Sequence, residues 1–172
     1  MNLHNLFRWK KRSKNMFTRA DCSVKDLIRY SVDRYSTAEK LYDCSDRSCW
    51  EYVHSAAFMS HQSIELLLKA CILCYKPEFP AEHNLKRLFK LLPKKKIELS
   101  VQNKNWLKHL NRFFALKYPD SGTGPEVAIK DWEKTKELFE ELKTKAPDEI
   151  QKEFMLTKRY GSNVRSGNIM GL

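Results

Sequence analysis

Apolar side chains recur every three or four residues along most of this chain, which is the spacing that places them on one face of an α-helix. The pattern predicts long helices over residues 24–42, 48–75, 98–117 and 125–145, and a short helix over residues 83–92. A brief helical restart is expected at residues 147–149, before a loose tail that begins at Gly161.

Residues typical of helix ends support these boundaries. Ser23 with Asp26, and Ser48 with Glu51, have the spacing of side chains that cap a helix start. Pro125 suits the first turn of the last long helix. The prolines fall between the periodic segments and never inside one.

The fold class that follows is all-α, an antiparallel up-and-down bundle of four to five helices. The chain divides into a basic N-terminal extension (residues 1–21), the helical bundle (residues 22–145) and a C-terminal helix or tail (residues 146–172). Hydrophobic residues make up 42% of the sequence and aromatic residues 12%, which is enough to form a core and excludes a disordered chain.

Composition also restricts the compartment. A membrane-spanning helix needs about 18 or more apolar residues in succession, and Glu65 and Lys69 interrupt the longest apolar run. The five cysteines are an odd number spread through predicted helices, which is typical of a reducing compartment. We therefore expect a cytoplasmic protein without a transmembrane segment.

Three short motifs occur in order along the predicted helices. Gln62, Glu65, Leu68, Lys69 and Ala70 form a Gln-x-x-Glu-x-x-Leu-Lys-Ala pattern, and His83, Leu85 and Leu88 form His-x-Leu-x-x-Leu. The long helix over residues 98–117 ends in Lys-Tyr-Pro-Asp at residues 117–120. Residues 22–145 thereby resemble the HEPN domain family, whose own pattern at the last site is Arg-Tyr-Pro-Asp.

The resemblance implies a four- to five-helix bundle that is commonly a homodimer. It also implies a role in RNA-targeting, toxin–antitoxin or nucleotide-binding systems, with RNA, a nucleotide or a nucleotidyltransferase-like protein as partner. A homodimer is favoured independently by a large aromatic inventory for one small bundle, namely Trp50, Trp106, Phe113, Phe114 and Trp132.

Ribonucleases of the resembled family carry an arginine followed, after four to six residues, by a histidine that acts on the phosphodiester. Arg47 and His54 have this spacing, but about one such match is expected by chance. The family places the motif near the later long helix, where Arg112 and Tyr118 occur and no histidine follows. We therefore expect no catalytic residues. The alternative is a divergent ribonuclease site formed by Arg47 and His54, or by Arg112 and Tyr118.

The motif residues also have a structural interpretation. Glu65 and Lys69 lie one helical turn apart in the orientation that stabilises a helix, with Gln62 beside them. They could equally bind a ligand or a second subunit. His83 could cap the short helix or contact a ligand.

Neither a metal nor a cofactor is expected. Cys71 and Cys74 form a single C-x-x-C inside a predicted helix, a placement more typical of core packing than of a zinc site. His54 and His61 would lie about 10 Å apart along one helix, too far to share an ion. Glycine-rich phosphate-binding loops are missing from the sequence.

The formal net charge of +11 is concentrated in two stretches without acidic residues. One is the N-terminal block, which comprises Arg8, Lys10, Lys11, Arg12, Lys14 and Arg19. The other spans residues 86–96, with Lys86, Arg87, Lys90, Lys94, Lys95 and Lys96. Such clusters attract polyanions. The function that these observations favour is a non-catalytic module that binds RNA, a nucleotide or a protein partner; a ribonuclease and a structural dimerising bundle are the alternatives.

Overall fold

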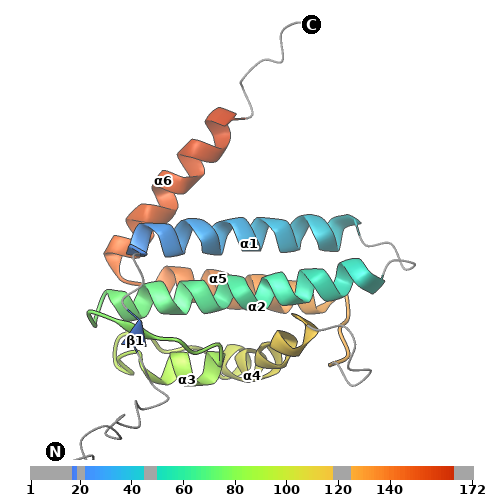
Figure 1. Ribbon diagram of the computed structural model, residues 1–172, viewed down its shortest axis with the longest axis horizontal. Coiled ribbons are helices and arrows are strands. Elements are labelled where there is room, and N and C mark those ends of the chain that lie inside the picture. The colour runs from blue at the N-terminus through green and yellow to red at the C-terminus, as the bar shows by residue number, and fades with distance from the viewer. Residues whose placement is uncertain (1–16, 19–21, 45–49, 118–124, 165–172) are drawn as a thin grey trace, which may run out of the picture.

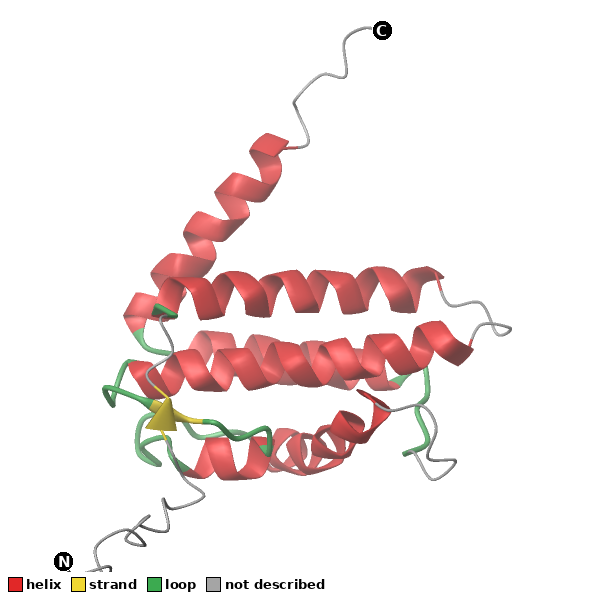
Figure 2. Cartoon of the chain, viewed as in Figure 1, coloured by secondary structure: helices red, strands yellow, loops and turns green. Residues whose placement is uncertain are grey.

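The structure is a computed structural model that describes residues 17–18, 22–44, 50–117 and 125–164. Helices make up most of it (Figure 2), and the predicted all-α fold is confirmed. None of the described helices is both long enough and apolar enough to cross a bilayer. The elements are α1 (Val24–Cys44), α2 (Trp50–Leu73), α3 (Leu85–Lys90), α4 (Val101–Leu110), the 3₁₀-helix η2 (Asn111–Lys117), α5 (Asp131–Lys145) and α6 (Asp148–Val164).

The central helix of the bundle is α2. In Figure 1, α1 runs alongside it on one side, α5 lies behind it, and α3 and α4 follow each other along the opposite side from α1. Because neighbours surround α2, its apolar residues are buried almost all the way round the helix axis. The buried set includes Ala56, Ala57, Ile64, Leu67, Leu68, Ala70, Cys71 and Ile72.

A buried pair of serines joins α1 to α2. The Ser31 hydroxyl donates to the Ser63 carbonyl oxygen at 2.8 Å, and the Ser63 hydroxyl donates to the Ser31 carbonyl oxygen at 2.9 Å. Small side chains let the two helices approach closely, and the reciprocal bonds satisfy both hydroxyls in the interior.

The predicted cap of α1 is confirmed. The Ser23 hydroxyl accepts from the Asp26 backbone N–H at 3.2 Å, and an Asp26 carboxylate oxygen accepts from the Ser23 N–H at 3.0 Å. These bonds satisfy two donors at the helix start. The second predicted cap, at Ser48, lies outside the described residues.

Two predicted boundaries are wrong. The last long helix, α5, begins at Asp131 and not at Pro125, because an Asp131 carboxylate oxygen accepts from the Ala128 N–H at 2.9 Å and starts the helix there. The expected brief restart at residues 147–149 is instead the 17-residue helix α6, which continues past Gly161. Ile150 and Phe154 bury one face of its first turns against the bundle, and beyond them α6 leads away from it (Figure 1).

The predicted helix over residues 98–117 is correct in extent but not in type. Its first part is α4, and it tightens into η2 after Leu110. A two-residue strand pair, which the sequence did not predict, joins β1 (Phe17–Thr18) to β2 (Phe79–Pro80) in antiparallel register. This pairing places Phe17 beside the segment that leads into α3.

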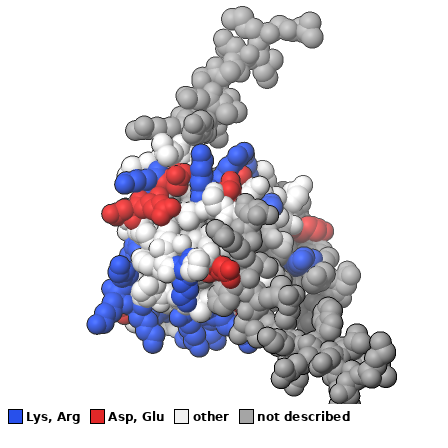
Figure 3. Space-filling view, turned by 60° about the vertical axis from the view of Figure 1, so that its left-hand side comes forward, with Lys and Arg blue, Asp and Glu red and all other residues white. Residues whose placement is uncertain are grey.

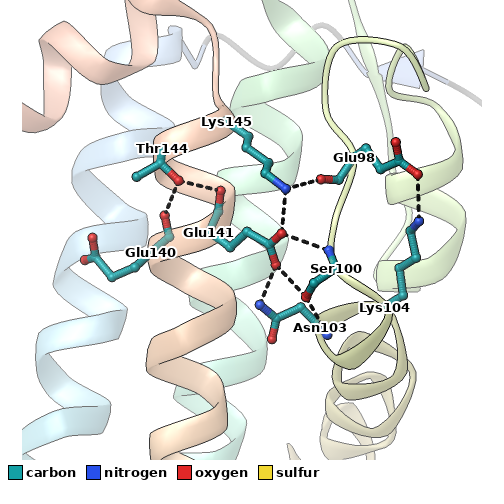
Figure 4. Close-up of polar contacts among 8 residues, drawn as sticks. All are labelled: Glu98, Ser100, Asn103, Lys104, Glu140, Glu141, Thr144 and Lys145. Atoms are coloured by element: carbon teal, nitrogen blue, oxygen red, sulfur yellow. Dashed lines mark hydrogen bonds and ion pairs between the residues drawn. The ribbon is translucent and has the colours of Figure 1, made fainter.

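The junction between α4 and α5 depends on Glu141 (Figure 4). Its carboxylate accepts from the Ser100 N–H at 2.8 Å, from the Ser100 hydroxyl at 3.0 Å and from the Lys145 ammonium at 2.6 Å, and it also accepts from the Asn103 side-chain amide. Ser100 itself caps α4. Burial alone would raise the pKa of Glu141, but the hydrogen bonds from Lys145, Asn103 and Ser100 outweigh it and lower that pKa to about 2.

Replacing Glu141 with Gln should lower the free energy of unfolding by about 1–2 kcal/mol at neutral pH, because charge-assisted bonds to the start of α4 are lost. The folded-state pKa of about 2 lies below the ordinary value of 4.5. The contribution of the Glu141 carboxylate to the free energy of unfolding is therefore fully present above pH 4.5 and is lost as the pH falls toward 2.

Urea unfolding followed by circular dichroism, at neutral pH and near pH 2, measures this effect. The difference in unfolding free energy between wild type and Glu141→Gln should disappear at acid pH. Glu140→Gln is the matched control, since the adjacent carboxylate is exposed and pairs only with Lys143 on its own helix. An equal difference in unfolding free energy at both pH values would contradict a stabilising role for the ionised Glu141 carboxylate.

Candidate functional site

A buried carboxylate lies at the centre of the candidate site. Glu65 is on α2 and is only 6% exposed. Its Oε1 is 2.7 Å from the Lys69 Nζ one turn later, and Lys69 is itself buried. His83, from the segment before α3, places Nδ1 at 3.0 Å from Oε1 and 3.1 Å from Oε2 of the same carboxylate. The structure thus brings together three of the residues that the sequence singles out.

A second histidine lies close to the same carboxylate. The His61 ring is fully buried, with Nδ1 3.8 Å from the Glu65 Oε2 and the ring centroid 5.5 Å from that of Phe114. Burial lowers the pKa of His61 to about 4, so this ring is neutral at pH 7. The sequence places His61 one helical turn before Glu65, so the two could share a ligand, but it does not show that His83 joins them.

The position of His83 is set by the carboxylate of Glu82. This carboxylate accepts from the backbone N–H groups of His83 and Asn84 at 3.1 and 3.0 Å, and from the Arg87 guanidinium at 2.9 Å. Burial raises the pKa of Glu82, but these bonds outweigh it and hold the pKa below its ordinary value. The Asn84 side chain then caps α3 by accepting from the Arg87 N–H at 3.1 Å.

Glu65 and His83 both line a pocket of about 340 Å³. The exposed ring of His83 stacks on Phe114, with centroids 4.9 Å apart and planes inclined by 16°. Four segments contribute to the pocket, namely α1, α2, the residues before α3, and η2. The lining residues are Tyr30, Arg34, Phe58, Gln62, Glu65, Leu66, His83, Phe114 and Lys117.

Next to this pocket along the chain, α3 and the turn after it carry the predicted basic residues. Lys86, Lys90, Lys94, Lys95 and Lys96 are all exposed and are called here the lysine surface. The turn is held by the Lys96 N–H, which donates to the Pro93 carbonyl oxygen at 2.9 Å, and by the buried Ile97 that follows it. Figure 3 shows Lys and Arg side chains gathered along the lower edge of the molecule, the edge on which α3 lies in Figure 1.

Arg87 differs from the lysine surface, because its guanidinium pairs with Glu82. Lys96 also makes a local contact, with Nζ 5.4 Å from the centroid of the Tyr75 ring. The remaining members project their ammonium groups into solvent from exposed positions on α3 and the turn.

The structure describes one member of each candidate catalytic pair and therefore places neither pair. Arg47 and Tyr118 lie outside the described residues, and His54 is half-buried on α2. Arg112 is exposed on η2, where it lines an open pocket of about 690 Å³ together with His109. His109 is the last histidine in the sequence and precedes Arg112 by three positions, whereas the motif of the family requires the histidine to follow the arginine.

In the described part of the chain, no three His, Cys, Asp or Glu side chains lie in an arrangement that could hold an ion. Cys71, of the single C-x-x-C, is buried in the core, where burial raises the pKa of its thiol.

Comparison with known proteins identifies the fold. The family model described as HEPN domain matches residues 24–146. No curated protein and no solved structure gives a significant match. The matched region contains α1 to α5, the buried Glu65 cluster and the lysine surface. The order of helices, the motifs on α2 and α3 and this match agree, and the chain belongs to the HEPN domain family.

Proposed function

We propose that this chain is a non-catalytic HEPN module that binds RNA through the lysine surface. The observation that carries the proposal is the exposure of Lys86, Lys90, Lys94, Lys95 and Lys96 on one short helix and the turn after it. Residues 83–97 contain no acidic side chain that could neutralise them. Closely spaced ammonium groups of this kind bind phosphates by releasing condensed counterions.

Replacing Lys94, Lys95 and Lys96 with Glu should weaken binding to single-stranded RNA at least about tenfold at low salt. The log–log dependence of affinity on salt should flatten by about 2, since each neutralised phosphate contributes about 0.7 on single strands. Fluorescence anisotropy with a labelled mixed-sequence oligonucleotide over a salt series measures both quantities. Thermal stability should change little, because the three side chains are exposed.

The matched control reverses Lys25, Arg29 and Lys40, three exposed cations of α1. In Figure 1 the helix α1 lies on the opposite side of α2 from α3. The control changes the net charge by the same amount. An unaltered salt slope in the Lys94, Lys95 and Lys96 variant, or an equal loss in the control, would contradict a localised RNA surface.

The RNA recovered from these titrations should be full length. A ribonuclease is the second candidate function, and the shared pocket of His109 and Arg112 is the observation that favours it. If wild type cuts the RNA and either His109→Ala or His54→Ala does not, the module is an enzyme and the non-catalytic proposal is wrong.

The proposal includes a homodimer in the cytoplasm, with a nucleotidyltransferase-like protein as a further partner in a toxin–antitoxin pair. Family membership supports the dimer. Two copies of the lysine surface in one particle would double the number of phosphate contacts, and light scattering on the protein used for the titrations measures the mass.

A further inference from the structure

A second pocket, larger than the one beside Glu65, lies between α4 with η2 on one side and residues 126–134 on the other. Its volume is about 690 Å³, which is within the range of sites that bury most of a ligand. One face of α4 and η2, from Gln102 to Arg112, forms one wall, and its described lining contains no member of the lysine surface.

Hydrogen bonds between α4 and α5 fix the floor of this pocket. The Trp106 indole N–H donates to the Thr135 hydroxyl at 3.2 Å, and that hydroxyl donates to the Asp131 carbonyl oxygen at 3.0 Å. The His109 ring stacks on Trp106, with centroids 4.8 Å apart and planes inclined by 28°. Because Trp106 is only 6% exposed, the floor is a pair of aromatic rings held in place before any ligand arrives.

Two cations that line the pocket are available to a ligand. Arg112 on η2 and Lys130 before α5 are both exposed, and neither pairs with a carboxylate of the described residues. Lys134 is different, because its Nζ lies 4.0 Å from the Asp131 Oδ1 and 4.9 Å from the centroid of the Trp106 ring. A guanidinium and an ammonium that line one pocket are suited to carboxylate ligands.

The pocket also contains acidic groups, which a strand of phosphates would avoid. Glu126 is exposed in it, and the buried Asp131 carboxylate accepts from the Ala128 N–H at 2.9 Å. The lysine surface, by contrast, belongs to a stretch without acidic residues. Phosphates spaced evenly along a ligand would be repelled by these carboxylates at short range. The pocket therefore favours a ligand with separate carboxylates over a polyphosphate.

Two side-chain amides offer the hydrogen bonds that a peptide backbone needs. The Gln102 amide donates to Glu137 at 3.1 Å, so its carbonyl oxygen can still accept. The Asn105 carbonyl oxygen accepts from the Lys108 Nζ at 3.2 Å, so its amide N–H groups can still donate. A peptide unit has one donor and one acceptor, and this pair of amides matches both.

We propose that this pocket, called here the α4–α5 pocket, binds an acidic peptide segment of a protein partner. Aspartate or glutamate side chains of the segment pair with Arg112 and Lys130. Its backbone bonds to the amides of Gln102 and Asn105, and one of its apolar side chains covers the His109 ring. The inference goes beyond RNA binding, because it adds a separate site with a different ligand.

Fluorescence anisotropy with two labelled hexapeptides tests the site at about 150 mM salt, where long-range attraction is screened. The acidic peptide is Asp-Glu-Phe-Asp-Glu-Leu, and the neutral peptide has Asn and Gln in place of Asp and Glu. The acidic peptide should bind saturably and at least about tenfold more tightly, because its carboxylates form charge-assisted hydrogen bonds. Equal affinities for the two peptides, or no saturable binding of the acidic one, would overturn the proposal.

Arg112→Ala with Lys130→Ala should weaken binding of the acidic peptide at least about tenfold, since both charged contacts are lost. The matched control is Lys25→Ala with Arg29→Ala, which removes two exposed cations of α1 that do not line the pocket. At this salt concentration the control should change the affinity by less than about twofold. An equal loss in the two variants would show that net charge alone attracts the peptide, and the proposal would be wrong.

Tryptophan emission reports on the same site. Trp106 lines the pocket, so saturation with the acidic peptide should change the emission of the wild-type protein. In Trp106→Phe the peptide should still bind, because an aromatic floor remains, but the change in emission should be absent. A change that persists in this variant would place the peptide elsewhere on the molecule and contradict the assignment of the α4–α5 pocket.

The lysine variant separates this inference from the RNA-binding proposal. The Lys94, Lys95 and Lys96 to Glu protein should lose affinity for RNA and keep most of its affinity for the acidic peptide. The Arg112→Ala, Lys130→Ala protein should do the reverse. A loss of RNA affinity in this pocket variant as large as in the lysine variant would make the pocket part of the RNA surface and overturn the peptide site. Wild type that binds the acidic peptide but not RNA would contradict the RNA proposal and support this one.

Discussion

Glu65→Ala should lose about 3–5 kcal/mol of unfolding free energy, because it removes one partner of a buried ion pair and leaves the other charged. The Lys69 side chain is only 9% exposed, and its Nζ lies 2.7 Å from the lost carboxylate. The nearby Phe79 ring, 5.4 Å from Nζ, compensates for little of that attraction. Urea unfolding at neutral pH gives the change.

The double variant Glu65→Leu with Lys69→Met should recover most of the lost stability, since an apolar pair of similar volume requires no buried charge. Glu133→Ala is the control, because its pair with Lys136 is exposed, and it should cost at most about 0.5 kcal/mol. A loss in Glu65→Ala no larger than in this control would mean that Lys69 reaches water in the variant.

Phe113→Ala should lose about 3–5 kcal/mol, the usual range for deleting a fully buried phenylalanine ring. Phe113 is inaccessible to solvent, and the Trp106 ring lies edge-on to it at a centroid distance of 6.2 Å. The loss should be accompanied by a change in tryptophan fluorescence of the folded protein, because Trp106 then borders a cavity.

Phe114→Ala provides a matched comparison, since the next residue in η2 carries the same side chain but only partly buries it at the pocket wall. Its removal should cost about half as much or less, because less apolar area is returned to water. Similar losses for both variants would show that η2 moves as a unit when either ring is deleted.

The sequence predicted most of the fold because the apolar spacing of α1, α2 and α5 is regular and the start of α1 carries a recognisable signal. Ser23 and Asp26 are only three positions apart along the chain, so local geometry alone determines their contact. Glu65 and Lys69 were likewise predictable as a pair, since one helical turn separates them.

Features that depend on distant residues were not predictable. His83 meets Glu65 across 18 positions, and the start of α5 depends on Asp131 reaching back over residues that looked helical. The length of α6 was underestimated because Gly161 is a poor helix residue, whereas Ile150 and Phe154 anchor the helix by packing on the bundle. Periodicity contains no information about such long-range contacts.

Because β1 pairs with β2, the backbone at Phe17–Thr18 is held beside the segment that leads into α3, and most cations of the N-terminal block precede this strand in the sequence. Under the RNA binding that we propose, the strand pair tethers a second basic cluster to the bundle and raises its effective concentration. A strand of RNA released by one cluster would then be recaptured by the other, and its residence time would exceed what either cluster gives alone.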